Sequence, residues 1–148
     1  MTLVYPGSFA PFTRGHHAIV MRAVTFTDRL VVAVGKNSVK ESFVAPLAER
    51  VETIRRLYVA IPRIEVVACE DMLMSDFVRS LGNDAVILRG IRSFSDFEYE
   101  QTVAEVNRRL NGVETLFLFA EPAYAHISSS VIRELLRYGK DVSDYLPG

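Results

Sequence analysis

Residues 5–16, YPGSFAPFTRGH, are the residues whose types and spacing are best suited to chemistry. A short apolar strand runs into Gly7 and Ser8, and a Thr-Arg-Gly-His step then opens an amphipathic helix. A glycine-marked turn of this kind offers backbone N–H groups and the positive end of a helix to an anion. We expect His16, in the first helical turn, to face that anion. The alternative is a tight turn with a capping threonine and a surface histidine, but the ordered combination favours the functional interpretation.

A second cluster, Arg-Gly-Ile-Arg, follows the fourth predicted strand. The guanidinium groups of Arg89 and Arg92 suit an oligophosphate, because each planar fork binds two oxygens at once. Gly90 allows the backbone to approach a ligand closely. The alternative is a turn held by structural ion pairs, for example to Asp96 or Glu98.

Two lysines follow the second predicted strand, in the segment GKNSVK at 35–40. A lysine at this place binds phosphate as a mobile point charge. We assign that role to Lys40, because the other anion-seeking clusters lie at the same sheet edge, and we expect Lys36 to be solvated.

Three serines, Ser128–Ser130, precede an apolar helical pattern. One serine is expected to cap the helix. Because a cap needs only one hydroxyl, the triplet and the free N–H groups of the helix start are candidates for a second anion site.

The remaining reactive side chains predict less chemistry. Met72, Leu73, Met74 and Phe77 lie at helical spacing, which is typical of core packing, although a methionine can also line a groove for a thin, flexible ligand. His17 and His126 have no second ligand at metal-binding spacing, so we predict no metal-binding residues. The single cysteine, Cys69, is expected to be buried.

These clusters must be positioned by alternating strands and helices. Apolar strand patterns occupy 3–5, 30–34, 64–68, 85–88 and 115–119. Helical patterns occupy 17–26, 47–58, 72–81, 94–110 and 129–138. The alternation predicts an α/β fold, a Rossmann-like doubly wound five-stranded parallel sheet with helices on both faces. Ligands of such sheets bind beyond the carboxyl ends of the strands, where the glycine, lysine and arginine clusters all lie.

Composition narrows the class of protein. The chain has 148 residues, 49% of them hydrophobic and 24% charged, so we predict one globular domain over 1–148. A net charge of −1 argues against a nucleic-acid partner. We expect no membrane span and a cytoplasmic location, because no apolar run approaches transmembrane length and no leader pattern opens the chain.

Taken together, the motifs resemble the nucleotidyltransferase superfamily, whose signature is GxFDP followed by T/HxGH. The whole chain resembles its bacterial phosphopantetheine adenylyltransferase family. The matching segments, in chain order, are YPGSF, TRGH, LAER, LMSDF, LRGIR, DFEYE, NR and ISSS. The RGxR and DFEYE pair argues against the sister enzymes that act on nicotinate mononucleotide or use CTP.

The resemblance implies an enzyme that transfers the adenylyl group of ATP to 4′-phosphopantetheine, giving dephospho-coenzyme A and pyrophosphate. It also implies Mg²⁺, a homohexamer and coenzyme A as an inhibitor. By position it implies catalytic roles for His16, Lys40 and Arg92, and an acceptor site at Ser8, Lys40, Met74 and Arg89. The implied ATP contacts are Ser8, Phe9, His16, Gly90, Ile91, Arg92, Glu100, Tyr124, Ala125, His126, Ile127, Ser128, Ser129 and Ser130.

Two positions depart from the family pattern. Ala10 stands where the family has aspartate, and Arg14 where it usually has asparagine. The lost carboxylate leaves a second interpretation open, a weakly active module that binds a nucleotide or coenzyme A. The attacking phosphate monoester is mostly dianionic at pH 7, with a second pKa of about 6, so we expect direct in-line transfer without a general base.

Overall fold

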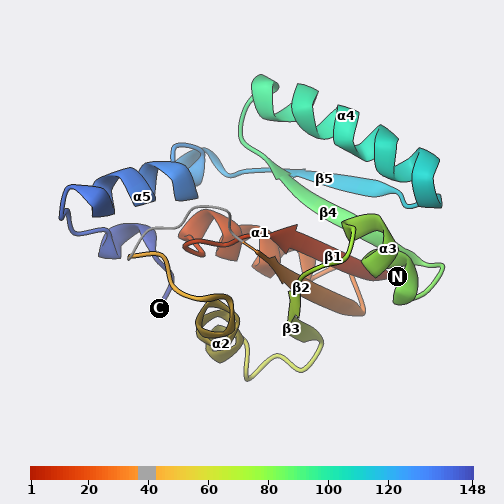
Figure 1. The fold of residues 1–148 in the computed structure, drawn as a ribbon, viewed down its shortest axis with the longest axis horizontal. Coiled ribbons are helices and arrows are strands. Elements are labelled where there is room, and N and C mark those ends of the chain that lie inside the picture. The colour runs from red at the N-terminus through yellow and green to blue at the C-terminus, as the bar shows by residue number, and fades with distance from the viewer. Residues whose placement is uncertain (37–42) are drawn as a thin grey trace.

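The computed structural model describes residues 1–36 and 43–148. Its strands form one parallel sheet in the order β3-β2-β1-β4-β5 (Figure 1). They are β1 (Thr2–Gly7), β2 (Arg29–Gly35), β3 (Ile64–Cys69), β4 (Ala85–Ile91) and β5 (Thr115–Phe119). The predicted Rossmann-like sheet is therefore confirmed, and β5 has the predicted bounds.

Helices cover both faces of this sheet, as predicted (Figure 1). Helices α1 (Arg14–Ala23) and α2 (Leu47–Leu57) pack on the face of Leu3 and Val32. On the other face, α3 (Met74–Ser80) packs against Val4 and Ile87, and α4 (Phe94–Asn111) lies beside α3 and β4. Helix α5 (Ser129–Arg137) carries a small apolar cluster of its own, and short 3-10 turns occupy η1 (Pro122–Tyr124) and η2 (Ser143–Tyr145).

The two central strands separate toward their carboxyl ends. Strand β1 pairs with β4 only from Thr2 to Val4, although it stays paired with β2 as far as Gly7. Strand β4 continues instead along β5, to the pair Ile91 and Phe119. The order of the strands reverses between β1 and β4, and the crevice at such a reversal is where open α/β sheets bind ligands.

Several predicted boundaries differ from the structure by one to three residues, and two of the differences have a clear physical reason. Strand β4 extends to Ile91, because β5 supplies ladder partners, so Arg89 and Gly90 lie within the strand and only Arg92 follows it. Helix α1 begins at Arg14 rather than at 17, because Thr13 caps it.

Several side chains lie as the sequence predicted. Cys69 is buried and Lys36 is exposed. Met74 and Phe77 pack against the core, whereas Met72 and Leu73 are both 53% exposed. Among the described residues, no helix combines the length and apolar character of a membrane span.

Candidate active site

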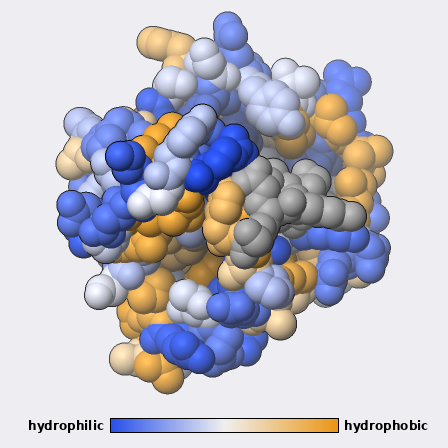
Figure 2. All heavy atoms as spheres, turned by 60° about the vertical axis from the view of Figure 1, so that its left-hand side comes forward, coloured by the Kyte–Doolittle hydropathy of each residue, from blue (hydrophilic) through white to orange (hydrophobic). Residues whose placement is uncertain are grey.

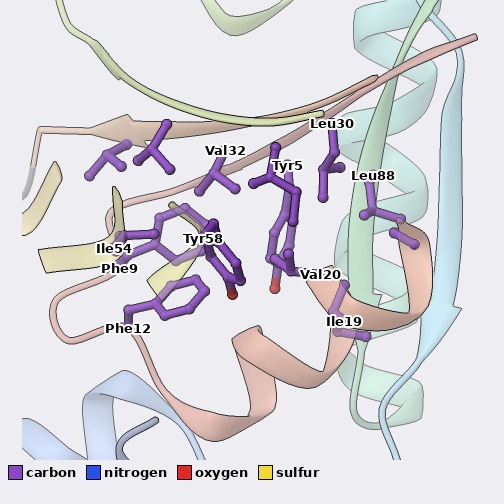
Figure 3. Packing of buried hydrophobic residues seen from close by; sticks show 14 of the residues in the cluster. Tyr5, Phe9, Phe12, Ile19, Val20, Leu30, Val32, Ile54, Tyr58 and Leu88 are labelled. Carbon is purple, nitrogen blue, oxygen red and sulfur yellow. The ribbon is translucent and has the colours of Figure 1, made fainter. Parts of the chain in front are cut away.

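The turn after β1 is shaped by a glycine and three aromatic rings. A Cβ on Gly7 would lie 2.9 Å from the ring of Phe9, so this position requires glycine. Phe9 has a φ of 47° and its ring packs edge-on against Tyr5 and Phe12, with centroids 5.3 and 5.2 Å away. These rings belong to the buried cluster beneath α1 and α2 (Figure 3). The turn is thus held by core packing.

The hydrogen bonds of His16 fix its protonation. The backbone N–H of Thr13 donates to His16 Nδ1 at 3.0 Å, while Thr13 Oγ1 accepts from the His16 backbone N–H at 3.3 Å. This reciprocal pair is a capping box at the start of α1. Because Nδ1 accepts, the imidazole proton is assigned to Nε2, which remains as a donor.

The surroundings of His16 keep the ring neutral. Phe12 stacks on the imidazole at 5.4 Å, and Phe9 meets it edge-on at 5.0 Å. Burial, together with the positive charges of Arg92 and Arg89, lowers the pKa of His16 to about 3. His16 is therefore a neutral hydrogen-bond donor near pH 7, which suits it to stabilise charge on an oxygen.

A cavity of about 370 Å³ opens between β1, β4 and the start of α5. Figure 2 looks from the side of α5 and shows hydrophilic and hydrophobic residues interspersed on this face. The cavity brings together most of the site residues that the sequence predicts: Ser8, Phe9, His16, Arg89, Gly90, Arg92, Glu100, Tyr124, Ile127, Ser128, Ser129 and Ser130.

Two of the three arginines that line the cavity, Arg89 and Arg92, are paired with carboxylates. Arg89 Nε and Nη2 donate to the Glu100 carboxylate at 2.9 and 2.7 Å, and Arg89 Nη1 donates to Pro6 O at 2.7 Å. Arg89 thereby bridges the separated strands β4 and β1. Although burial lowers the pKa of Arg89, the hydrogen-bonded Glu100 carboxylate raises it above its usual value.

Arg92 makes a local ion pair on the rim of the same cavity. Its Nε and its backbone N–H both donate to Asp96 Oδ2, each at 3.1 Å. Of the two acids that sequence analysis named as alternative partners, Asp96 is thus correct. Glu98 is not the partner of either arginine, since Glu100 pairs with Arg89.

The three serines at the start of α5 divide their hydrogen bonds. Ser128 is the cap, and its Oγ accepts from the backbone N–H of Val131 at 3.2 Å. Ser129 Oγ donates to Pro11 O at 2.8 Å, and Ser130 Oγ accepts from Arg133 Nη2 at 3.3 Å. Arg133 also lines the cavity, a residue that sequence analysis missed. Its place four residues after Ser129, on the same helical face, was the available signal.

A second cavity, of about 320 Å³, lies on the other side of Arg89. It holds Met74 as predicted, and it adds Tyr99, Asn107 and Thr115, which sequence analysis did not single out. The Thr115 hydroxyl is buried and lacks a hydrogen-bond partner among the described residues. Both cavities are lined by Pro6, Gly7, Arg89 and Glu100, so they meet at these four residues.

Among the described residues, three candidate positions do not line these cavities. Ile91 is buried at the end of β4, whereas Ala125 and His126 are not among the residues that line either cavity. Lys40 lies outside the described residues, so its predicted role stays a prediction. Across 1–36 and 43–148, no three His, Cys, Asp or Glu side chains converge as metal ligands.

Comparison with known proteins identifies the family. Residues 4–135 match the cytidylyltransferase-like family model. Phosphopantetheine adenylyltransferases of Phocaeicola vulgatus and Bacteroides fragilis are 47% and 46% identical to the chain over 144 residues, covering 97% of it and 93% and 94% of their own lengths. The enzyme of Thiobacillus denitrificans is 44% identical, covering 99% of this chain and 90% of its own length.

Solved structures support the fold independently. A bifunctional NMN adenylyltransferase/ADP ribose pyrophosphatase from Francisella tularensis superimposes with a TM-score of 0.71 at 16% identity, covering 98% of this chain and 44% of its own. The shared architecture, the conserved length and the ordered motifs agree, and the chain belongs to the phosphopantetheine adenylyltransferase family.

Proposed function

We propose that this protein transfers the adenylyl group of ATP to 4′-phosphopantetheine, giving dephospho-coenzyme A and pyrophosphate. The observation that carries the proposal is the pair of cavities that meet at Gly7 and Arg89. A two-substrate transfer needs two binding spaces that join where the reacting phosphates meet. Family membership supplies the identity of the two substrates.

The transfer is a direct in-line displacement. An oxygen of the acceptor phosphate attacks the α-phosphorus of ATP, a new P–O–P bond forms, and the bond to the β-phosphate oxygen breaks to release pyrophosphate. The His16 Nε2–H donates to non-bridging oxygens of the α-phosphate as charge develops there. No proton has to be removed from the dianionic acceptor, which agrees with a neutral His16 whose Nδ1 is already occupied.

The first cavity is proposed to hold ATP. Arg92, Arg133 and the start of α5 place cationic and N–H groups where the β- and γ-phosphates would lie. The second cavity is proposed to hold the pantetheine arm against Met74, with Arg89 and Lys40 on the acceptor phosphate. Asn107 and the unpartnered Thr115 hydroxyl supply polar groups for the amides of that arm.

Mg²⁺ is proposed as the cofactor. The carboxylates of the ATP cavity, Asp96 and Glu100, are each engaged by an arginine. The chain therefore fits a metal carried mainly by the triphosphate and water, which is how Mg²⁺ commonly binds in phosphoryl-transfer sites. Bound there, it would screen the negative charge of the leaving pyrophosphate.

Self-association is proposed as well, in the homohexamer that the family resemblance implies. Helix α4 has only Glu100 buried, and it exposes Phe94 (90%), Tyr99 (69%) and Leu110 (57%). Exposed apolar patches of this kind mark protein–protein interfaces. Light scattering of the purified protein tests the assembly. We also propose a cytoplasmic location and competition of coenzyme A for the two cavities.

A coupled assay of pyrophosphate release tests the function. Pyrophosphate release from ATP should require 4′-phosphopantetheine. Nicotinate mononucleotide should not replace 4′-phosphopantetheine, and CTP should not replace ATP. Binding of ATP or coenzyme A without turnover would favour the non-catalytic module that Ala10 left open.

A further inference from the structure

Arg50, on α2, is a charged side chain that the proposed mechanism does not use. Arg50 is only 7% exposed, although Glu49 and Glu52 on the same helix are exposed to solvent. A buried guanidinium is costly unless its N–H groups and its charge are compensated. The partners of Arg50 therefore indicate what it is retained for.

Among the described residues, Arg50 donates only to backbone carbonyls, which come from three separate segments. Its Nε donates to Ala45 O at 2.9 Å, and its Nη1 donates to Gly35 O at 3.0 Å and to Ser8 O. No carboxylate of the described residues pairs with it. Burial lowers the pKa of Arg50.

These three carbonyls lie at functionally different places on the carboxyl edge of the sheet. Ser8 belongs to the turn that lines the ATP cavity. Gly35 ends β2, lines the second cavity and precedes the segment that contains Lys40. Ala45 leads into α2. The planar guanidinium group of Arg50 thus sets the distance between the turn after β1 and the end of β2.

We infer that Arg50 is a positioning residue that aligns the acceptor side of the site, an inference that rests on the proposed function. Gly35, one of the residues it holds, lines the second cavity, which is proposed to hold the acceptor, and Ser8 is assigned to contacts with both substrates. The groups assigned to the pyrophosphate of ATP lie at the end of β4 and the start of α5, which Arg50 does not contact.

Two substitutions of Arg50 test this role. Arg50→Met keeps the apolar stem and removes all three hydrogen bonds, while Arg50→Lys keeps the charge on a group that cannot span three carbonyls. Displacements of about 1 Å can cost a hundredfold, so we expect the KM for 4′-phosphopantetheine to rise about tenfold to a hundredfold in Arg50→Met and less in Arg50→Lys. The KM for ATP should rise by no more than about threefold, because Arg50 makes no hydrogen bond to the groups assigned to the pyrophosphate of ATP.

Arg56→Met is the matched control. Arg56 lies on the same helix with a side chain 76% exposed, and its ion pair with Glu52 is long, at 3.8 Å. Its KM values should be unchanged. Equal shifts of both KM values in the Arg50 variants, or no shift, would overturn the inference. Loss of the folded state in both variants would also overturn it, because Arg50 would then serve stability alone.

The proposed function can fail separately. If the unmodified chain releases no pyrophosphate, calorimetric Kd values for ATP and 4′-phosphopantetheine still test Arg50. The same split, with weakened binding of 4′-phosphopantetheine only, would support the inference, and equal affinities in all variants would refute it.

Discussion

Replacing His16 tests whether a neutral N–H donor, rather than a proton carrier, accelerates the reaction. His16→Ala removes the Nε2–H group, and loss of one such preorganised donor typically lowers kcat about a hundredfold to a thousandfold. The affinity for ATP should change little, because the donor acts on charge that develops in the transition state. His16→Gln places an amide N–H near the position of Nε2, and it should retain more of the rate than His16→Ala.

The pH dependence of kcat separates the two roles. Because the pKa of His16 is lowered to about 3, the ring stays neutral throughout the range in which activity is measured. Near pH 6.5, the usual histidine value, the kcat of the unmodified protein should therefore show no step that is absent from His16→Gln. A step caused by the acceptor phosphate, whose second pKa is about 6, should be the same in both proteins. Stopped or continuous pyrophosphate assays at saturating substrates, from pH 6 to pH 9, measure this directly.

Stability should also respond, with a definite sign. The folded protein binds its His16 proton near pH 3, whereas the unfolded chain binds it near pH 6.5. Between these values the unfolded state holds more protons, so stability falls as pH falls, by up to about 1.4 kcal/mol per pH unit. Above about pH 6.5 the His16 contribution is fully present and constant.

Urea unfolding at pH 7 and pH 5 checks the linkage. The loss of unfolding free energy between the two pH values should be smaller in His16→Gln, which cannot titrate, than in the unmodified protein. His17, whose pKa is lowered by burial, remains in both proteins and cancels in the comparison. A near-normal kcat in His16→Ala, or a kcat that titrates with a pKa near 6.5 only when His16 is present, would refute the reasoning.

Three further substitutions test the remaining assignments. Lys40→Ala should raise the KM for 4′-phosphopantetheine more than the KM for ATP, and pantetheine without its phosphate should be a poor substrate; equal use of pantetheine would contradict the mechanism. Glu100→Gln should lower the unfolding free energy by about 2–3 kcal/mol, because it leaves Arg89 half-buried without its carboxylate, and a urea midpoint within error of the parent would show that the pair is not structural. Ala10→Asp should raise turnover while ATP binding persists, and an unchanged or lower kcat would mean that the chain is adapted to alanine.

The sheet could be predicted because its signal is local. Strands buried on both faces are nearly continuous apolar runs, as β1 and β2 are. The apolar run at 115–119 was also placed without error, although none of its residues is fully buried. The carboxyl end of β4 was not, since Arg89 and Gly90 are extended only because β5 lies alongside them. The pairing of β4 with β5 is a tertiary contact, so the residues of β4 alone do not predict it.

The sequence predicted most of the residues that line the site, but it did not predict the hydrogen bonds between them. Topology alone brings Ser8, His16 and Arg92 to one crevice, because carboxyl ends of neighbouring parallel strands meet. The partner of Arg89 depends on which face of α4 turns toward β4, and the tautomer of His16 depends on the geometry of the cap. The sequence indicates neither the partner of Arg89 nor the tautomer of His16. It also does not indicate the role of Arg50, which follows from hydrogen bonds to three carbonyls distant in the chain.

The effect of having Ala10 where the family has aspartate depends on which groups surround this position. Ala10 is 3% exposed and is not among the residues that line the ATP cavity. It lines a separate cavity of about 190 Å³, whose described walls include Arg50 and Arg133 and no acidic residue. A carboxylate at this position would therefore meet two guanidinium groups before it met a metal or a phosphate. Its attraction to them would tighten the turn that Arg50 and Arg133 already hold through Ser8 O and Ala10 O. The expected gain from Ala10→Asp is thus one of geometry, transmitted through the arginines, and repulsion of the substrates is weakened because the same cations neutralise the added charge.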